Sequence, residues 1–187
     1  MHAVLQQVFE SYRERLAPRS TDWCQLHPQK LERLWSCQEL MEHLVLTCRS
    51  TSRVLGERLQ RGPTSAHSTP TQWILQLAML SLGRMPRGVP APAFARPDQL
   101  HWPPMSGAEL LELFRQEIDQ MDTLIDTCRQ RFGVQRVASH IILGPLRPDQ
   151  WRRFHVIHMR HHLDQLRRIE SEVGQSAFSE AHSRPAP

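Results

Sequence analysis

The sequence predicts an all-α protein in which four helices pack as a bundle with a long crossover connection. The fourteen prolines are unevenly placed and leave long windows that contain none. Proline is excluded from helix interiors, so these windows are where long helices fit. The chain has a single tyrosine and few β-branched residues, so strand signals are weak. One window also carries an unbroken heptad pattern, which favours nearly antiparallel helix packing.

The first two helices are expected in residues 1–17 and 29–62. The first window is amphipathic, with the apolar residues Val4, Leu5, Val8, Phe9, Tyr12 and Leu16. The second window ends at Gly62–Pro63 and gathers its apolar residues on one face: Cys37, Leu40, Met41, Leu44, Cys48, Leu55 and Leu59. An apolar stripe at helical spacing is typical of a helix that packs on a core.

A short helix is expected at about 71–83, and an irregular connection follows over 86–104, which contains six prolines. The window 105–144 carries the heptad pattern: Leu111, Phe114, Ile118, Met121, Ile125, Cys128 and Phe132. Ser106 is the expected N-cap of this helix, because serine accepts from exposed N–H groups there. Gly133 is the expected C-terminal stop.

The last helix is expected to begin at Pro148–Asp149, since proline is favoured in a first helical turn. Just before it, the run His140–Leu143 is briefly strand-like. A chain of 187 residues favours one domain with a sizeable core. We therefore expect a single domain over residues 1–175 and a disordered tail over 176–187.

Composition and charge argue against several classes of function. The net charge of +4 and the isoelectric point of about 9.3 are basic, but acids are interleaved with the arginines and no long run of like charge occurs, so we expect no nucleic-acid partner. The longest apolar stretch, Trp73–Leu82, is about half a membrane span, so we expect no membrane. The N-terminus lacks the pattern of a secretory signal, and the four cysteines form no CxxC pair. We expect free thiols and a cytoplasmic location.

The last helix carries the residues with metal-binding chemistry. On a helical wheel, His158 and His162 lie in the middle of the inward lane, together with Trp151, Phe154, Gln165 and Ile169. The opposite side carries Arg152, Arg153, Arg160, Asp164 and Arg167. Two histidines four residues apart stack on one helical face and form half of a metal site. A third ligand must come from another helix, and His43, at the edge of the apolar face of 29–62, is the candidate.

Simpler interpretations stay open for each of these residues. His43 alone fits a hydrogen-bonded or solvated histidine, and a HxxxH pair occurs often by chance. His155 and His161 flank the lane and are expected to support the ligands or face solvent. His140 is expected to cap the last helix or line the mouth of the site. Cys37 is expected to be a core thiol, with an approach to the site as the alternative.

These residues together resemble a known family. The segments are Trp35-Ser36 with His43-Leu44 on an early helix, His158-Met-Arg-His-His162-Leu-Asp-Gln165 on the last, His140-Ile-Ile-Leu-Gly144, Leu146-Arg-Pro-Asp-Gln-Trp151, and Gly83-Arg-Met-Pro-Arg-Gly-Val-Pro90. They are similar to the DinB/YfiT superfamily, in an uncharacterised branch, over about Trp35–Ile169. The resemblance implies a four-helix bundle that holds a divalent metal through His43, His158 and His162. Three histidines suit Zn, Ni, Fe and Cu alike, and we expect Zn, Ni or Fe.

The resemblance also implies a class of reaction. Characterised relatives are metal-dependent thiol S-transferases that act on small electrophiles, and thiol-dependent isomerases, which implies a low-molecular-weight thiol as a further cofactor. Arginines near the site are the expected partners of the carboxylates of such a thiol. A metal-dependent hydrolase using a metal-bound hydroxide is one alternative, and a non-catalytic metal-binding bundle is another. Whether the chain is an enzyme stays open. The expected partner is a small-molecule substrate, with a homodimer left open.

Overall fold

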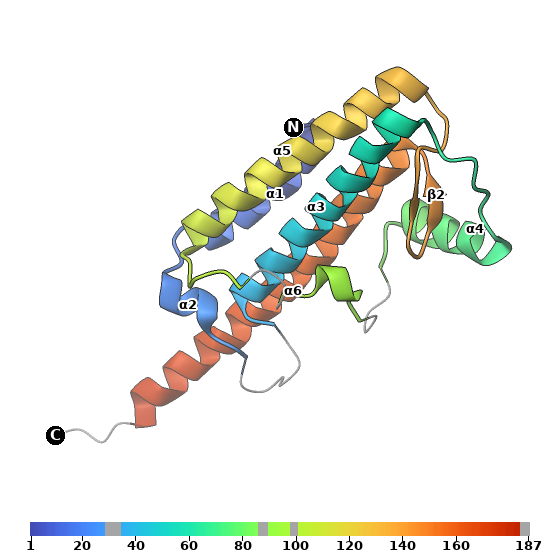
Figure 1. The fold of residues 1–187 in the computed structure, drawn as a ribbon. Coiled ribbons are helices and arrows are strands. Elements are labelled where there is room, and N and C mark those ends of the chain that lie inside the picture. The colour runs from blue at the N-terminus through green and yellow to red at the C-terminus, as the bar shows by residue number, and fades with distance from the viewer. Residues whose placement is uncertain (29–34, 86–89, 98–100, 184–187) are drawn as a thin grey trace.

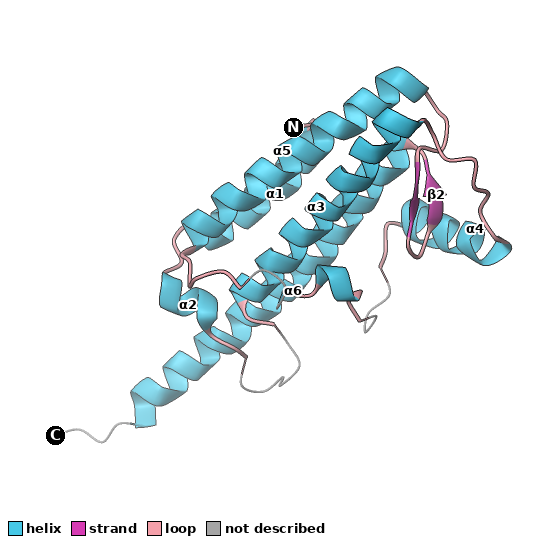
Figure 2. Ribbon diagram, viewed as in Figure 1, coloured by secondary structure: helices cyan, strands magenta, loops and turns pink. Residues whose placement is uncertain are grey.

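Four long helices lie alongside one another in the computed structural model (Figures 1 and 2): α1 (Ala3–Leu16), α3 (Cys37–Arg61), α5 (Gly107–Phe132) and α6 (Pro148–Ser183). The structure describes residues 1–28, 35–85, 90–97 and 101–183, and side chains up to Val173 in α6. The prediction of a predominantly helical chain is confirmed. Helix α6 continues through residues 176–183 of the expected tail, where the sequence holds no proline before Pro185. No described helix is long and apolar enough to cross a membrane.

Reciprocal side-chain caps fix where the helices begin. At α5 the hydroxyl of Ser106 accepts from the backbone N–H of Glu109, whose carboxylate accepts from the N–H of Ser106. Ser36 and Glu39 make the same pair at the start of α3. Each pair satisfies N–H groups that a helix leaves open. Gly133 follows α5 with a φ of 60°, so the predicted cap and stop of this helix are both confirmed.

The predicted apolar faces form the core. All seven residues of the heptad pattern on α5 are at most 9% exposed. Every predicted core residue of α3 is buried except Leu59, which is partly buried against the core. The prediction was wrong for Val4, which is 40% exposed. It lies one residue before the buried Leu5, and the 100° step between neighbours turns it out of the interface.

Short elements connect the long helices. Helix α2 (Thr21–Gln25), capped by Ser20, was not predicted. Helix α4 (Pro70–Gln76) continues as the π-helical turn η1 (Leu77–Ser81), so the short helix expected at 71–83 is present. In the proline-rich connection, the 3₁₀ turn η2 (Ala93–Ala95) packs on α3. The beginning of the second predicted window, residues 29–34, and parts of that connection, 86–89 and 98–100, lie outside the described residues.

A two-stranded hairpin joins α5 to α6. Strands β1 (Ala138–His140) and β2 (Gly144–Leu146) pair antiparallel, with His140 opposite Gly144. The strand-like run His140–Leu143 is therefore corrected: its first residue ends β1 and the rest form the turn. The Nδ1 atom of His140 closes this turn by accepting from the N–H groups of Ile142 and Leu143, at 3.1 and 3.2 Å.

Glycine is required at the start of β2. Gly144 has a φ of 70°, and a Cβ atom there would lie 2.4 Å from the side-chain oxygen of Gln72 in α4. The positive φ strains any larger residue at this position, whereas the neighbouring atom is the end of a flexible side chain that can shift. Helix α4 lies against the hairpin, where Gln76 donates to the carbonyl of Leu143, at the end of the molecule where α3 ends and α6 begins (Figure 1).

Arg152 departs from the predicted wheel. It was placed on the outward side of α6, but it is 5% exposed. Its guanidinium donates to Asp122 and Asp126 of α5, each at 2.7 Å. The helical wheel correctly places Arg152 on the side of α6 opposite His158. Helix α5 covers that side near Arg152 and supplies the two carboxylates. The neighbouring Arg153 and Arg160 are exposed as predicted.

Candidate metal centre

Three histidines from two helices meet between α3 and α6. His43 lies in the second turn of α3, and His158 and His162 are one turn apart on α6. The Nε2 atom of His158 lies 3.2 Å from Nε2 of His43 and 3.1 Å from Nε2 of His162. All three side chains are buried. Within the described part of the chain, no other set of three His, Cys, Asp or Glu side chains converges in this way.

The outer nitrogens of two of these rings are held by oxygen atoms. The Nδ1 atom of His43 lies 2.6 Å from the carbonyl oxygen of Ala95 in η2. Nδ1 of His162 lies 3.0 Å from the side-chain oxygen of Gln165, one turn along α6. Because these oxygens only accept, each Nδ1 carries the proton and each Nε2 keeps its lone pair. Both lone pairs point toward the centre of the cluster.

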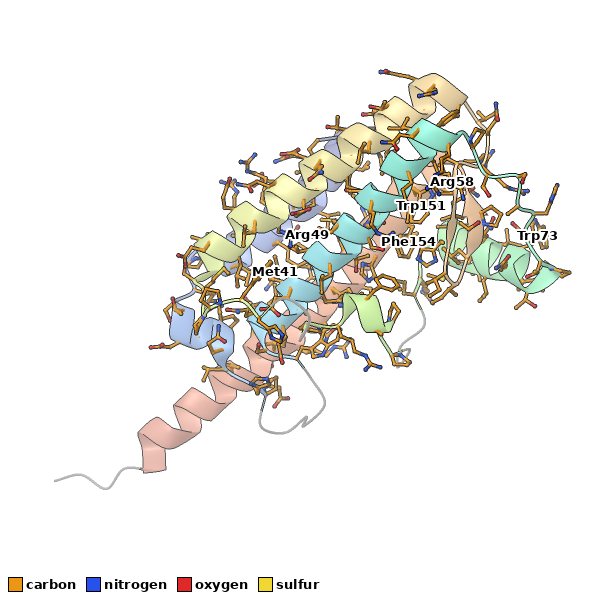
Figure 3. The ribbon with its side chains drawn as sticks, in the orientation of Figure 1. Met41, Arg49, Arg58, Trp73, Trp151 and Phe154 are labelled. Carbon is orange, nitrogen blue, oxygen red and sulfur yellow. The ribbon has the colours of Figure 1, made fainter. Side chains whose placement is uncertain are left out.

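His158 has a different environment. Its Nδ1 atom is buried and has no hydrogen-bond partner among the described residues. Its ring stacks on Phe154, with centroids 5.4 Å apart and planes at 16°. Figure 3 shows Phe154 and Trp151 on the side of α6 that faces the hairpin. On its outer side the ring of His158 is therefore held by stacking rather than by a hydrogen bond at Nδ1.

Burial keeps the cluster uncharged. Desolvation, strengthened by the other histidines, lowers the pKa of His158 well below its usual value and that of His162 to about 3. Burial also lowers the pKa of His43, against the opposing effect of the Ala95 carbonyl. Metal ions bind imidazole only in its neutral form. The three rings are thus in the protonation state that ligation needs at neutral pH.

Aromatic rings close the cluster on two sides. Trp35 lies 4.9 Å from the ring of His43 and stacks over His162 at 6.3 Å, centroid to centroid. Trp35 is only partly buried, whereas Phe154 on the other side is 4% exposed. The side of the cluster next to Trp35 is therefore the one nearer to solvent.

The flanking residues have separate roles. His155 is fully buried and its Nε2 pairs with the hydroxyl of Thr51 on α3 at 2.9 Å, so it is not exposed. His161 is half-buried and meets His162 edge to ring at 5.1 Å. His140 caps the hairpin turn and packs on Phe154 at 4.4 Å, rather than capping α6. Cys37 is a buried core thiol whose hydrogen bond with Cys24 raises its pKa, and it lies outside the cluster.

Two features of the cluster were not predicted from the sequence. The carbonyl of Ala95 is a backbone group in a proline-rich segment, and no side chain marks it. The contact between His155 and Thr51 could be predicted only if it were known how α3 is aligned along α6. Gln165 was placed in the inward lane without a role. Its position three residues after His162 could have predicted the contact between the two side chains, because residues at this spacing are neighbours on a helix.

Helical proteins can build metal sites from side chains on facing helices. The buried histidines of α3 and α6 place this chain in that class, as a protein whose cluster could hold a metal ion. The model of the DinB superfamily matches residues 5–166. The chain belongs to this superfamily. No curated protein and no solved structure matches the chain.

Proposed function

We propose that His43, His158 and His162 bind one divalent metal ion through their Nε2 atoms, in a four-helix bundle of the DinB type. The convergence of these three atoms carries the proposal. Nitrogens that share one tetrahedral ion at about 2.0–2.1 Å lie about 3.3 Å apart, close to the 3.1 and 3.2 Å found here. One ligand atom from each of the three histidines lies within 4.8 Å of the other two, which supports a single shared ion.

Proton counting supports the same conclusion. With Nδ1 of His43 and of His162 protonated, both Nε2 atoms are acceptors. Only His158 has a proton to offer, and one proton cannot serve both of its contacts with full strength. Buried acceptors left without a donor cost free energy. A cation at the centre would satisfy all three lone pairs at once.

We further propose that the chain is a metal-dependent transferase that joins a small thiol to an electrophile. A divalent metal held by three neutral imidazoles keeps its charge and lowers the pKa of a thiol or water beside them. His43 and His162 present their lone pairs in fixed orientations because Ala95 and Gln165 hold their outer nitrogens. Trp35 provides an apolar wall at the more exposed side, where a small electrophile would pack. Buried Arg152 is committed to two aspartates, so a carboxylate of the thiol would be bound by other arginines.

Elemental analysis tests the metal site first. The protein is purified without a histidine tag and its metal content is measured for the wild type and for His43→Ala, with His155→Ala as the matched control. We expect close to one equivalent for the wild type and the control, and none for His43→Ala. Metal retained by His43→Ala would contradict the ligand assignment.

A thiol screen then tests the reaction. Monochlorobimane serves as the electrophile, with cysteine and coenzyme A as thiols, and turnover is compared for metal-loaded protein and His43→Ala. Thiol-dependent turnover by the loaded protein alone supports the transferase. Ester hydrolysis without a thiol would favour a hydrolase instead, and loaded protein with neither activity would favour a non-catalytic metal-binding protein.

A further inference from the structure

Six large apolar side chains are exposed at one end of the molecule. They lie on α4, on its continuation η1 and after it, and at the tip of the hairpin, and we name them the α4–hairpin face: Trp73, Ile74, Leu77, Leu82, Ile141 and Ile142. Each is between 42% and 73% exposed. Figure 3 shows Trp73 on the outer side of α4, away from the four long helices. Such a concentration is unusual on a free surface.

Helix α4 and its continuation η1 carry apolar side chains on two sides: Leu75, Met79 and Leu80 pack on the core, whereas a second apolar group is exposed. Gln76 is buried and donates its amide to the carbonyl of Leu143 at 2.6 Å, whereas the adjacent Leu77 is 52% exposed. Trp73, Ile74 and Leu77 fall within about 100° of one another on a helical wheel. The polar contact of Gln76 joins α4 to the hairpin turn that carries the two isoleucines. Gln76 therefore docks the helix on its own hairpin, and Trp73, Ile74 and Leu77 stay exposed beside the residues that pack on the core.

The area of the face is that of a protein interface. At about 200 Å² for a fully exposed aromatic side chain, an upper bound for leucine and isoleucine, the exposed fractions amount to at most about 700 Å². The largest apolar patch on a typical monomer is about 300–600 Å². A standard interface buries about 800 Å² on each partner, and homodimer interfaces are the more apolar ones.

We propose that the α4–hairpin face binds the same face of a second copy of this chain, forming a two-fold symmetric dimer. In such a dimer each copy covers the other's apolar patch, so one contact removes both from water. The patch supplies most of the area that a stable dimer needs, and polar residues at its edge supply the rest. The metal centre is not part of the contact, so this inference does not depend on the proposed reaction.

The charges around the face set how the dimer responds to salt. Residues 62–85 and 133–147, which form this end of the molecule, contain no aspartate or glutamate. They contain Arg84, Arg136 and Arg147, all exposed. Two copies meeting here bring like charges toward one another, and salt screens that repulsion. The dimer should therefore become tighter as ionic strength rises, whereas an acidic partner or an anionic membrane would be released.

Sedimentation velocity of the wild-type protein tests the proposal over a range of protein and salt concentrations. The test variant is Leu77→Glu, which places a charge in the patch at an exposed position, and the matched control is Leu26→Glu, an apolar residue 46% exposed outside the patch. We expect a wild-type dimer that tightens with salt, an unchanged control, and a dissociation constant at least about 100-fold higher for Leu77→Glu. Circular dichroism and metal content check that both variants fold.

Several outcomes would overturn the proposal. A wild-type protein that stays monomeric at all concentrations shows that no second copy binds. A dimer that Leu77→Glu leaves intact places the contact elsewhere. A monomer that sediments with vesicles of phosphatidylglycerol, and is released by salt and by Leu77→Glu, assigns the face to a lipid surface instead.

Discussion

The Nδ1 atom of His43 lies 2.6 Å from the carbonyl oxygen of Ala95, and this contact ties a proline-rich connection to the histidine cluster. Pro92 adopts an extended conformation, and the 3₁₀ turn that follows it directs the carbonyl of Ala95 toward α3. Without such an acceptor, a histidine ring can rotate and exchange its two nitrogens. The connection is therefore more than a link between α4 and α5, because it selects which nitrogen of His43 faces His158 and His162.

Gln165 should orient the ring of His162 by accepting from its Nδ1, as the carbonyl of Ala95 does for His43. Replacing Gln165 with Leu removes the acceptor at 3.0 Å from Nδ1 and should weaken metal affinity by about 10–100-fold. Gln165→Glu keeps an acceptor and should bind at least as tightly as the wild type. Competition with a fluorescent chelator measures both, and the exposed Asp164→Asn is the control. Equal affinities for the Leu and Glu variants would show that the contact has no role in ligation.

His162 and His155 should respond oppositely to replacement. His162→Ala should lose stoichiometric metal while the fold survives, because the apolar core supplies most of the stability. His155→Ala should keep its metal but unfold at a lower temperature, since it leaves a cavity and the hydroxyl of Thr51 without its partner. Metal analysis and thermal denaturation separate the two effects. If the His155 variant lost its metal and the His162 variant kept it, the wrong histidines of α6 would have been assigned as ligands.

The sequence predicts the helices and the candidate ligands because both depend on local spacing. Proline-free windows locate the long helices, and the spacing of His158 and His162 places both on the inward lane. What it does not predict depends on partners distant in sequence. Arg152 is buried because Asp122 and Asp126 face it from α5, and His155 because Thr51 faces it from α3. The hairpin is not predicted from periodicity, because strands of three residues are too short to show an alternating pattern.

Acid should destabilise the metal-free protein through its buried histidines. Burial lowers the pKa of His140 to about 4 and those of His155 and His162 to about 3, against about 6.5 in an unfolded chain. Below pH 6.5 the unfolded chain binds protons that the folded protein does not, so the free energy of unfolding falls with pH. Each group contributes up to about 1.4 kcal/mol per pH unit between its two pKa values. Above about pH 6.5 these groups cause no dependence.

Urea denaturation of the chelator-treated protein between about pH 7 and 5 measures this slope. The matched variant is His140→Asn, because an asparagine oxygen accepts from the same two N–H groups of the hairpin turn but does not titrate. Its slope should be smaller by up to about 1.4 kcal/mol per pH unit. An identical slope in the variant would mean that His140 protonates as easily in the folded protein as in the unfolded chain.

Removal of Arg152 should be among the most destabilising changes away from the metal centre. Asp122 is 3% exposed, and Arg152→Leu leaves its charge buried without a cation, which costs about 3–5 kcal/mol. The double variant with Asp122→Leu should recover part of the loss, because no unpaired charge then remains. Replacing the exposed Arg160 with Leu is the control and should change little. A small effect of Arg152→Leu, measured by urea denaturation, would mean that water reaches Asp122 once the arginine is removed.

The metal at this centre should be catalytic rather than structural. Structural zinc sites are closed by four protein ligands, often cysteines, whereas catalytic sites keep a position for water or substrate. Three histidines converge here, and in the described part of the chain no fourth His, Cys, Asp or Glu joins them. Cys37 is six residues before His43 on the same helix, which puts it about 9 Å away along the helix axis.

X-ray absorption of the metal-loaded protein tests this directly. We expect three nitrogen neighbours with one or more exchangeable oxygens and no sulfur, and an identical spectrum for Cys37→Ser. Addition of a small thiol should then replace an oxygen by sulfur. Sulfur present before thiol is added, and lost in Cys37→Ser, would make the centre a closed structural site and would remove the position that the proposed reaction requires.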